Sequence, residues 1–200
     1  MSEPYEMIMS PFQIYLGPVG ETFPEIQATP AGNWVLLGTN GKDNMGNEGI
    51  IATHGQTLIE HRNVGSTGIK KVVRETEFLT FEGLLEDLTA TMYAKILNNN
   101  TVTPVAADSD TGGYSRVYLY QGRTVSLFAM LCRGVSPYGD SWFTHYQCPV
   151  VYQLANPAPA FTKSGVAALK FSFGVIEDPD AASEAARFGQ MLFQTASPTG

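Results

Sequence analysis

Two long segments of mixed polarity dominate the pattern of apolar and polar positions along the chain. Glu48–Asn63 and Ile69–Glu82 are predicted to pair as a β-hairpin around Val64–Gly68, a connection with two glycines. Each segment is far longer than the usual strand of about 5–6 residues. Neither alternates cleanly, so both faces of the predicted ribbon are part polar and part apolar. A chain of 200 residues cannot bury two such faces, and we expect at least one face to meet water or another subunit.

A single amphipathic helix is predicted over Leu84–Leu97, directly after the hairpin. Its apolar side chains recur at three- and four-residue spacing, as in a helix that buries one face: Leu85, Leu88, Met92 and Ile96. Glu86 and Asp87 in the first turn and Lys95 in the last turn complement the helix dipole. Asn98–Asn100 follows, with residues that tolerate the left-handed conformation of a helix stop.

The rest of the chain is predicted to form shorter strands, separated by turns that contain glycine and proline. These strands are Pro11–Gly17, Trp34–Leu37, Ser115–Tyr120, Thr124–Arg133, Trp142–Ala155 and Gly165–Ile176, of which the third and fourth are expected to form a hairpin. Exposed loops are expected at Thr39–Asn47, Thr101–Tyr114 and Asn156–Lys163. The expected fold class is therefore mainly β with one helix.

The length of the chain favours one domain with an extended end. Residues 1–178 are assigned to the β domain, and the alanine-rich residues 179–200 to a C-terminal extension. This extension is predicted to be weakly helical over Asp180–Phe193 and flexible beyond it. Charged residues make up 16% of the chain, below the ~25% that is usual for soluble domains. The low share indicates that other molecules cover much of the surface.

The chain is acidic, with a formal net charge of −7. Lys70, Lys71 and Arg74 form its one cationic cluster in the sequence, and Glu75 and Glu77 follow at once. Tight binding of nucleic acid depends on neutralising phosphates with lysine and arginine, so this class of function is disfavoured. Passage of DNA without tight binding stays open, because an acidic wall repels phosphates.

Cys132 and Cys148 are the only cysteines in the sequence, and both lie in apolar runs typical of strands. This placement indicates buried thiols in a reducing compartment, rather than a disulfide or a metal site. The residues from Met1 to Pro4 lack the basic flank and apolar core of a signal peptide. No run approaches the ~18 apolar residues of a membrane span. We therefore expect a chain that is kept soluble inside a cell and has no membrane partner.

Candidate catalytic and metal-binding groups are scattered along the sequence. The histidines show no metal-ligand spacing: His54, His61 and His145. Asp108–Gly113 lacks the closing glutamate of a calcium loop, because Leu119 stands in its place. Glu75 and Glu77 are expected about 7 Å apart on one strand face, a spacing that suits a glycosidase and also arises by chance. We expect no enzymatic activity and no cofactor.

The predicted segments follow one another in an order that is similar to that of a known protein family. Ile14–Gly20, a short strand with a Gly-Pro-Val-Gly turn, precedes a loop broken by prolines and a second strand, Trp34–Gly38. The long hairpin follows, Lys71–Glu82 leads into the predicted helix, and Phe171–Val175 closes the series. This order resembles that of tailed-bacteriophage tail tube proteins, the major tail proteins of long-tailed phages. The resemblance covers residues 10–178 and rests on the pattern of segments.

The resemblance implies a β-sandwich or partial barrel flanked by one helix, with the long hairpin completing an inner barrel shared between subunits. Six copies would form a ring with four strands from each, and rings would stack into a tube for DNA ejection into the host. Barrels of 16–18 strands already enclose an aqueous channel, so a barrel of about 24 strands would pass a duplex of ~20 Å. Ring closure would also remove the exposed edges of the long strands.

Four glutamates of the hairpin are candidates for an acidic lumen wall along which DNA slides: Glu48, Glu60, Glu75 and Glu77. An outward-facing position is the competing interpretation for each. The resemblance implies hexamers and contacts with tape measure, tail terminator and distal tail proteins, with transient passage of DNA. The implied location is the virion tail, assembled in the bacterial host cytoplasm. Thr39–Asn47 and the N-terminal segment are expected to make contacts between rings.

A monomeric β-sandwich that binds carbohydrate is the alternative, with Trp142, Tyr138 and Tyr146 as its stacking surface. The mixed polarity of both long strands favours assembly, since a lone binding module does not need it.

Overall fold

The computed structural model describes residues 12–86, 88–136, 142–159, 161 and 167–196. Strands make up 46% and helices 9% of the structure, so the predicted mainly β class is confirmed. Predictions for the N-terminal eleven residues, Asp87, Tyr138 and the last four residues concern positions outside the described ones. In chain order the elements are β1 (Gln13–Gly17), β2 (Val35–Leu36), η1 (Gly41–Asn44), β3 (Met45–His61), β4 (Lys71–Leu85), α1 (Ala90–Asn98), β5 (Val102–Val105), β6 (Tyr114–Val117), β7 (Leu127–Val135), β8 (Phe143–Gln153), β9 (Leu169–Val175), η2 (Glu184–Ala186) and β10 (Gln190–Phe193).

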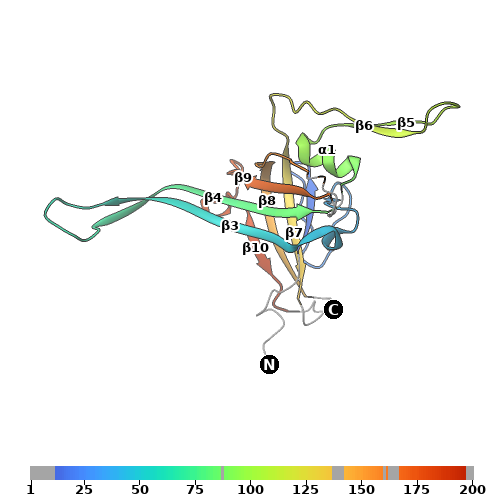
Figure 1. Cartoon of the computed structure of the whole chain (residues 1–200). Coiled ribbons are helices and arrows are strands. Elements are labelled where there is room, and N and C mark those ends of the chain that lie inside the picture. Colours follow the sequence, from blue (N-terminus) through green and yellow to red (C-terminus); the bar gives the residue numbers. More distant parts are fainter. Residues whose placement is uncertain (1–11, 87, 137–141, 160, 162–166, 197–200) are drawn as a thin grey trace.

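One antiparallel sheet forms the body, in the strand order β2-β1-β7-β8-β9-β4-β3. Val151–Gln153 of β8 pairs with β9, whereas Thr144–Gln147 pairs with β10, so the sheet divides along β8. Figure 1 shows β3, β4 and β9 crossing the direction of β7 and β8, with α1 beside them. β5 and β6 form a separate hairpin. The body therefore matches the expected β-sandwich or partial barrel with one flanking helix.

The core lies between the crossing parts of this sheet. Its largest buried side chains come from four strands and from α1: Ile14, Leu16, Phe81, Ile96, Met130, Phe171 and Phe173. Cys132 and Cys148 belong to the same core as free, buried thiols, as predicted. Burial raises the pKa of the Cys148 thiol to about 12 and also raises the pKa of Cys132. Both thiols are therefore protonated and unreactive in the folded chain.

The helix begins later than its apolar spacing predicts. β4 continues through Leu85, which pairs with β9 in the body sheet, so the predicted start at Leu84 is wrong. α1 starts after Thr89, whose side-chain oxygen accepts a hydrogen bond from an N–H of the first turn at 3.2 Å. Glu86 therefore precedes the helix and does not lie in its first turn. The predicted left-handed stop is confirmed at Asn99, which has a φ of +56°.

The segment after α1 also departs from the prediction. Thr101–Tyr114 is not all loop, because it contains β5, and β5 pairs with β6. The predicted hairpin between Ser115–Tyr120 and Thr124–Arg133 is therefore wrong. The Asn98 side chain hydrogen-bonds the backbone of three residues within 121–126 and holds this connection against the end of α1. This connection, residues 121–126, is anchored to the end of α1 and is not a hairpin turn; we call it the strap.

Two further expectations are corrected. Thr39–Asn47 is not a wholly exposed loop, because it forms η1 and the first residues of β3, and Met45 is buried in the core. Asp180–Phe193 is not a helix: it forms the three-residue η2 and then β10, which pairs with β8. Gly189 permits this path, because its φ is +95° and a Cβ there would overlap the carbonyl oxygen of Gln147.

The sheet face opposite the core is covered by the segment between β1 and β2. Phe23 and Trp34 of this segment pack with their ring centroids 5.2 Å apart. Arg133 of β7 donates a hydrogen bond to the backbone carbonyl of Gln27 at 3.2 Å. His145 of β8 is the register partner of Arg133 and is fully buried. Neither of its ring nitrogens has a hydrogen-bond partner among the described residues.

Acid is expected to destabilise the fold through His145. Burial and the charge of Arg133 lower the pKa of His145 from 6.5 to about 4. Between these values the unfolded chain binds a proton that the folded chain does not. The free energy of unfolding therefore falls as the pH drops below 6.5, by about 3 kcal/mol in total once the pH is below 4.

Urea unfolding of the wild type and of His145→Gln, measured from pH 7 down to pH 4, tests this expectation. The substitution should flatten the decline, whatever its effect at pH 7. An equal decline in both proteins would assign the acid sensitivity to other groups.

Candidate assembly interface

β3 and β4 extend far beyond the body as a two-stranded ribbon, the long arm, which comprises residues 54–79 (Figure 1). β4 pairs with β9 only from Thr80 to Leu85. β3 is the last strand of the sheet and pairs with β4 alone. Among the described residues, both backbone edges of the long arm are therefore unpaired. Neither long strand is enclosed within the protomer.

The two faces of the long arm differ in what they contact. The inner face carries His54 and Leu79, which are register partners on the same side as buried Phe81. On the outer face, the ring of Phe78 lies over Gly55, where a Cβ would overlap it. Further out, both faces present apolar side chains that are 43–49% exposed: Ile59, Val73 and Phe78 on the outer face, and Leu58 and Val72 on the inner face. An exposed apolar row of this kind is typical of a surface that another molecule covers.

Two of the four lumen candidates lie on the inner face of the long arm. Glu60 forms an ion pair with Arg62, and Glu77 forms one with Arg74, both at 2.9 Å. All four of these side chains are about half exposed, so each pair adds little to stability. The pairs do neutralise the two carboxylates locally.

The other two candidates occupy irregular positions. Glu75 lies at a bulge and has no register partner, which interrupts the alternation that placed it on one face with Glu77. Glu48 lies at the base of the hairpin, within the register shift between Met45 and Ile50. The structure thus brings Glu60 and Glu77 to one face and does not join the four glutamates into one surface.

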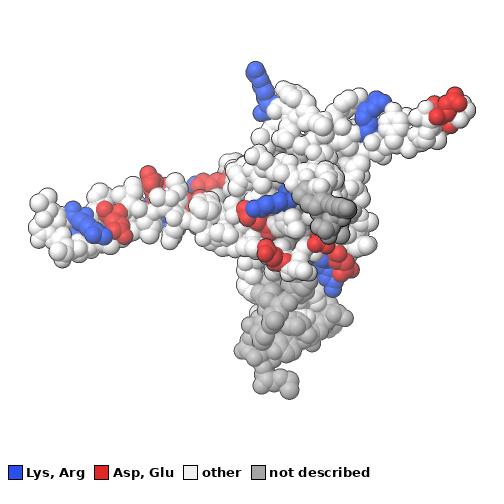
Figure 2. Space-filling view, viewed as in Figure 1, with Lys and Arg blue, Asp and Glu red and all other residues white. Residues whose placement is uncertain are grey.

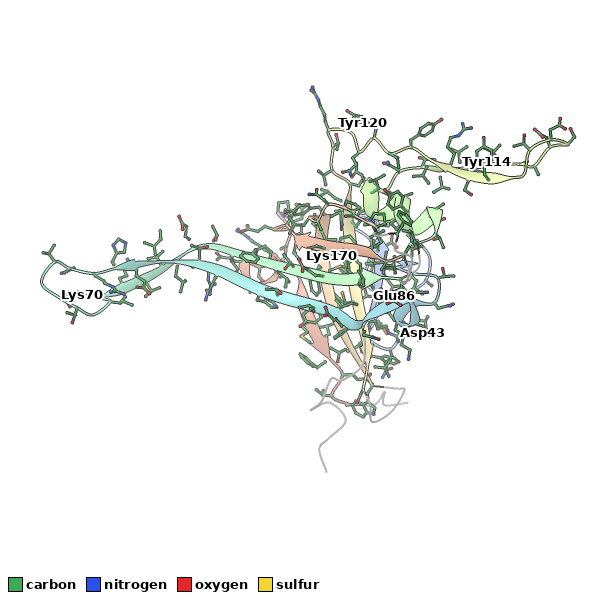
Figure 3. All side chains as sticks on the ribbon, in the orientation of Figure 1. Asp43, Lys70, Glu86, Tyr114, Tyr120 and Lys170 are labelled. Carbon is green, nitrogen blue, oxygen red and sulfur yellow. The ribbon has the colours of Figure 1, made fainter. Side chains whose placement is uncertain are left out.

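The long arm is more basic than the rest of the chain. It carries four Lys/Arg and three Glu, a formal net charge of +1, in a chain of net charge −7. Lys70 and Lys71 stand near its end and form no ion pair with a described residue. Figure 2 shows basic atoms near this end, and Figure 3 labels Lys70 there. The long arm therefore carries a small net positive charge, while the rest of the chain is net negative.

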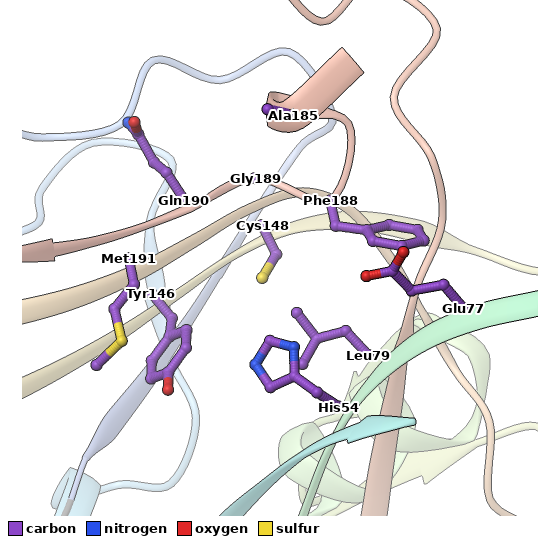
Figure 4. A pocket seen from close by; sticks show the side chains of 10 residues that line it. All are labelled: His54, Glu77, Leu79, Tyr146, Cys148, Ala185, Phe188, Gly189, Gln190 and Met191. Carbon is purple, nitrogen blue, oxygen red and sulfur yellow. The ribbon is translucent and has the colours of Figure 1, made fainter. Parts of the chain in front are cut away.

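A groove of about 300 Å³ lies where the inner face of the long arm meets the C-terminal segment. His54, Glu77 and Leu79 line it from the arm, and Phe188 lines it from the segment before β10 (Figure 4). Tyr146 closes the floor, with its ring centroid 5.3 Å from that of Phe81. Tyr146 is thus packed against the core and also lines the groove.

A second projection, the short arm, comprises residues 102–117 of the β5–β6 hairpin and extends past α1 (Figure 1). Tyr114 accepts a hydrogen bond at 2.9 Å from the guanidinium of Arg116, and both are exposed. At the tip, the side chain of Asp108 accepts hydrogen bonds from the N–H groups of Asp110 and Thr111 at 2.9 and 2.7 Å. These bonds lower the pKa of Asp108, so its carboxylate stays ionised.

The described residues do not gather the side chains of a metal-binding centre. They contain no group of three or more His, Cys, Asp or Glu that could hold a metal. The three histidines are apart, since His54 lines the groove, His61 lies near the end of the long arm and His145 is buried in the body. None of the helices in the described part of the chain has the length and apolar character needed to cross a bilayer.

No protein-family model matches the chain, and no curated protein matches it either.

Proposed function

We propose that this protein is a structural subunit of a hollow tube, the tail tube of a long-tailed bacteriophage. In this proposal six copies form a ring, rings stack, and the tube conducts DNA into the host without binding it tightly. Its partners are further copies of the chain and the tape measure, tail terminator and distal tail proteins. The location is the virion tail after assembly in the bacterial cytoplasm, and no enzymatic step is involved.

The observation that carries the proposal is the long arm with two unpaired strand edges. An isolated two-stranded ribbon is marginally stable in water, and a long open edge invites pairing with another chain. β3 offers one edge and the outer part of β4 offers the other. Because these edges are different surfaces, pairing between them is head-to-tail, which produces a ring when the rotation closes.

Charge supports passage of DNA rather than retention. Between positions 48 and 82 there are five glutamates and four Lys/Arg, and two of the arginines are paired with Glu60 and Glu77. A wall of such balanced charge releases few counterions when DNA approaches, so it binds the duplex weakly. A nucleic-acid-binding surface would instead present a basic stripe.

Electron microscopy of purified protein over a range of concentrations tests the proposal. Rings with sixfold symmetry and an open channel, or stacked tubes, are the expected result. Particles that remain single subunits at every concentration would contradict the proposal and favour a monomeric module.

A further inference from the structure

The two arms leave the body in opposite directions (Figure 1). Figure 2 shows basic atoms with acidic atoms beside them near the end of the long arm, and acidic atoms at the tip of the short arm. Lys70 and Lys71 stand near the end of the long arm, and Asp108 and Asp110 stand at the tip of the short arm. None of these four side chains forms an ion pair with a described residue of its own chain. Each arm therefore exposes two neighbouring charges that lack an opposite partner among the described residues.

Both arm ends also expose apolar surface beside these charges. On the long arm, Ile69 and Val72 flank the lysines and are 45% and 49% exposed. On the short arm, Tyr114 pairs with Val105 at the end of the hairpin nearer the tip and is 46% exposed. Tyrosine and arginine are enriched at protein interfaces, and the Tyr114 hydroxyl accepts a hydrogen bond from the Arg116 guanidinium. The acidic tip of the short arm repels phosphates, which disfavours nucleic acid as the partner of this surface.

We propose that the end of the long arm of one copy docks on the short arm of a second copy, with Lys70 and Lys71 facing Asp108 and Asp110. The inference deepens the proposed function and rests on it, because it names two surfaces through which copies meet. Complementary charges guide the approach and fix the register, while the apolar side chains beside them lose contact with water. Since the two surfaces differ, the contact is heterologous and repeats from copy to copy.

Charge reversal tests this contact. One variant carries Lys70→Glu with Lys71→Glu, a second carries Asp108→Lys with Asp110→Lys, and a third carries all four changes. Each of the first two is expected to raise the concentration needed for half-assembly about tenfold or more, because like charges then face each other. The third should return to within about threefold of the wild type, since the attraction is restored with reversed signs. Sedimentation velocity measures all of them, and Arg123→Glu in the connection after β6, which neither arm contact uses, is the matched control.

A second measurement detects the contact directly. In a chain with Lys71→Cys and Asp110→Cys, oxidation should link neighbouring copies, while the buried native thiols stay unmodified. The arm contact would be overturned if the wild type assembles, the charge-reversal variants assemble equally well and no cross-link forms. The proposed function would not be affected by that result. Loss of assembly in both reversals without recovery in the third variant would overturn the arm contact as well. A wild type that never assembles would overturn the inference and the proposed function together.

Discussion

Removal of the outer part of the long arm is expected to weaken assembly strongly and to leave a folded monomer. Thr57 and Thr76 are register partners across the arm, so a two-residue Asn-Gly turn can replace residues 58–75. The deletion removes most of both unpaired edges and none of the core residues. If each contact between two copies loses about 3 kcal/mol of binding free energy, the protein concentration needed for assembly rises roughly a hundredfold. Sedimentation velocity and electron microscopy measure this loss, and circular dichroism measures the retained fold.

The matched control keeps the length of the arm. Replacing Val64–Thr67 in the connection by glycine and serine residues of equal number leaves both strands and their edges intact. This control should form the same rings or tubes as the wild type. Rings or tubes from the shortened protein would contradict the role given to the arm edges.

Truncation of Phe81 is expected to cause the largest loss of stability among single substitutions in the hairpin. Phe81 is 1% exposed, and its ring packs edge-on against Tyr146 with centroids 5.3 Å apart. Phe81→Ala removes most of a buried aromatic side chain and leaves a cavity that close-packed neighbours cannot fill. The free energy of unfolding should fall by about 3–5 kcal/mol. Urea unfolding of the arm-shortened monomer measures it without interference from assembly.

Phe78 provides a matched control in the same strand. It is the same residue type on the opposite face, and it is 47% exposed. Phe78→Ala, in the same arm-shortened background, should change the free energy of unfolding by no more than about 1 kcal/mol. In the full-length chain it should weaken assembly, because the outer face loses its largest apolar side chain. Equal losses of stability from both substitutions would contradict the assignment of inner and outer faces.

The long hairpin was predictable because its signals are local. No proline interrupts the segments on either side of Val64–Gly68, and the observed β3 and β4 bounds lie within a few residues of the prediction. The end of the helix was predictable for the same reason, since Asn99 adopts the left-handed conformation that asparagine tolerates. The burial of both cysteines followed from the apolar runs around them.

Other features depended on contacts between distant parts of the chain. The apolar spacing around Leu85 suits a helix or a strand, and pairing with Leu169 of β9 decides in favour of the strand. The path of residues 118–126 depends on hydrogen bonds from Asn98 and Asn100, which no pattern within that segment reveals. The positions of the candidate glutamates could not be predicted for the same reason. A bulge at Glu75 interrupts the strand alternation that the sequence implies.

Local periodicity and composition are thus enough to establish a mainly β chain with one helix, a very long hairpin and a net acidic charge. They are enough because strand alternation, glycine turns and net charge are properties of short segments or of the whole composition. The separation of the two arms, their opposite charges at opposite ends and the two unpaired edges appear only in three dimensions. Those features depend on where β9 stops pairing with β4 and on how α1 anchors the strap, and both are interactions between residues far apart in the chain.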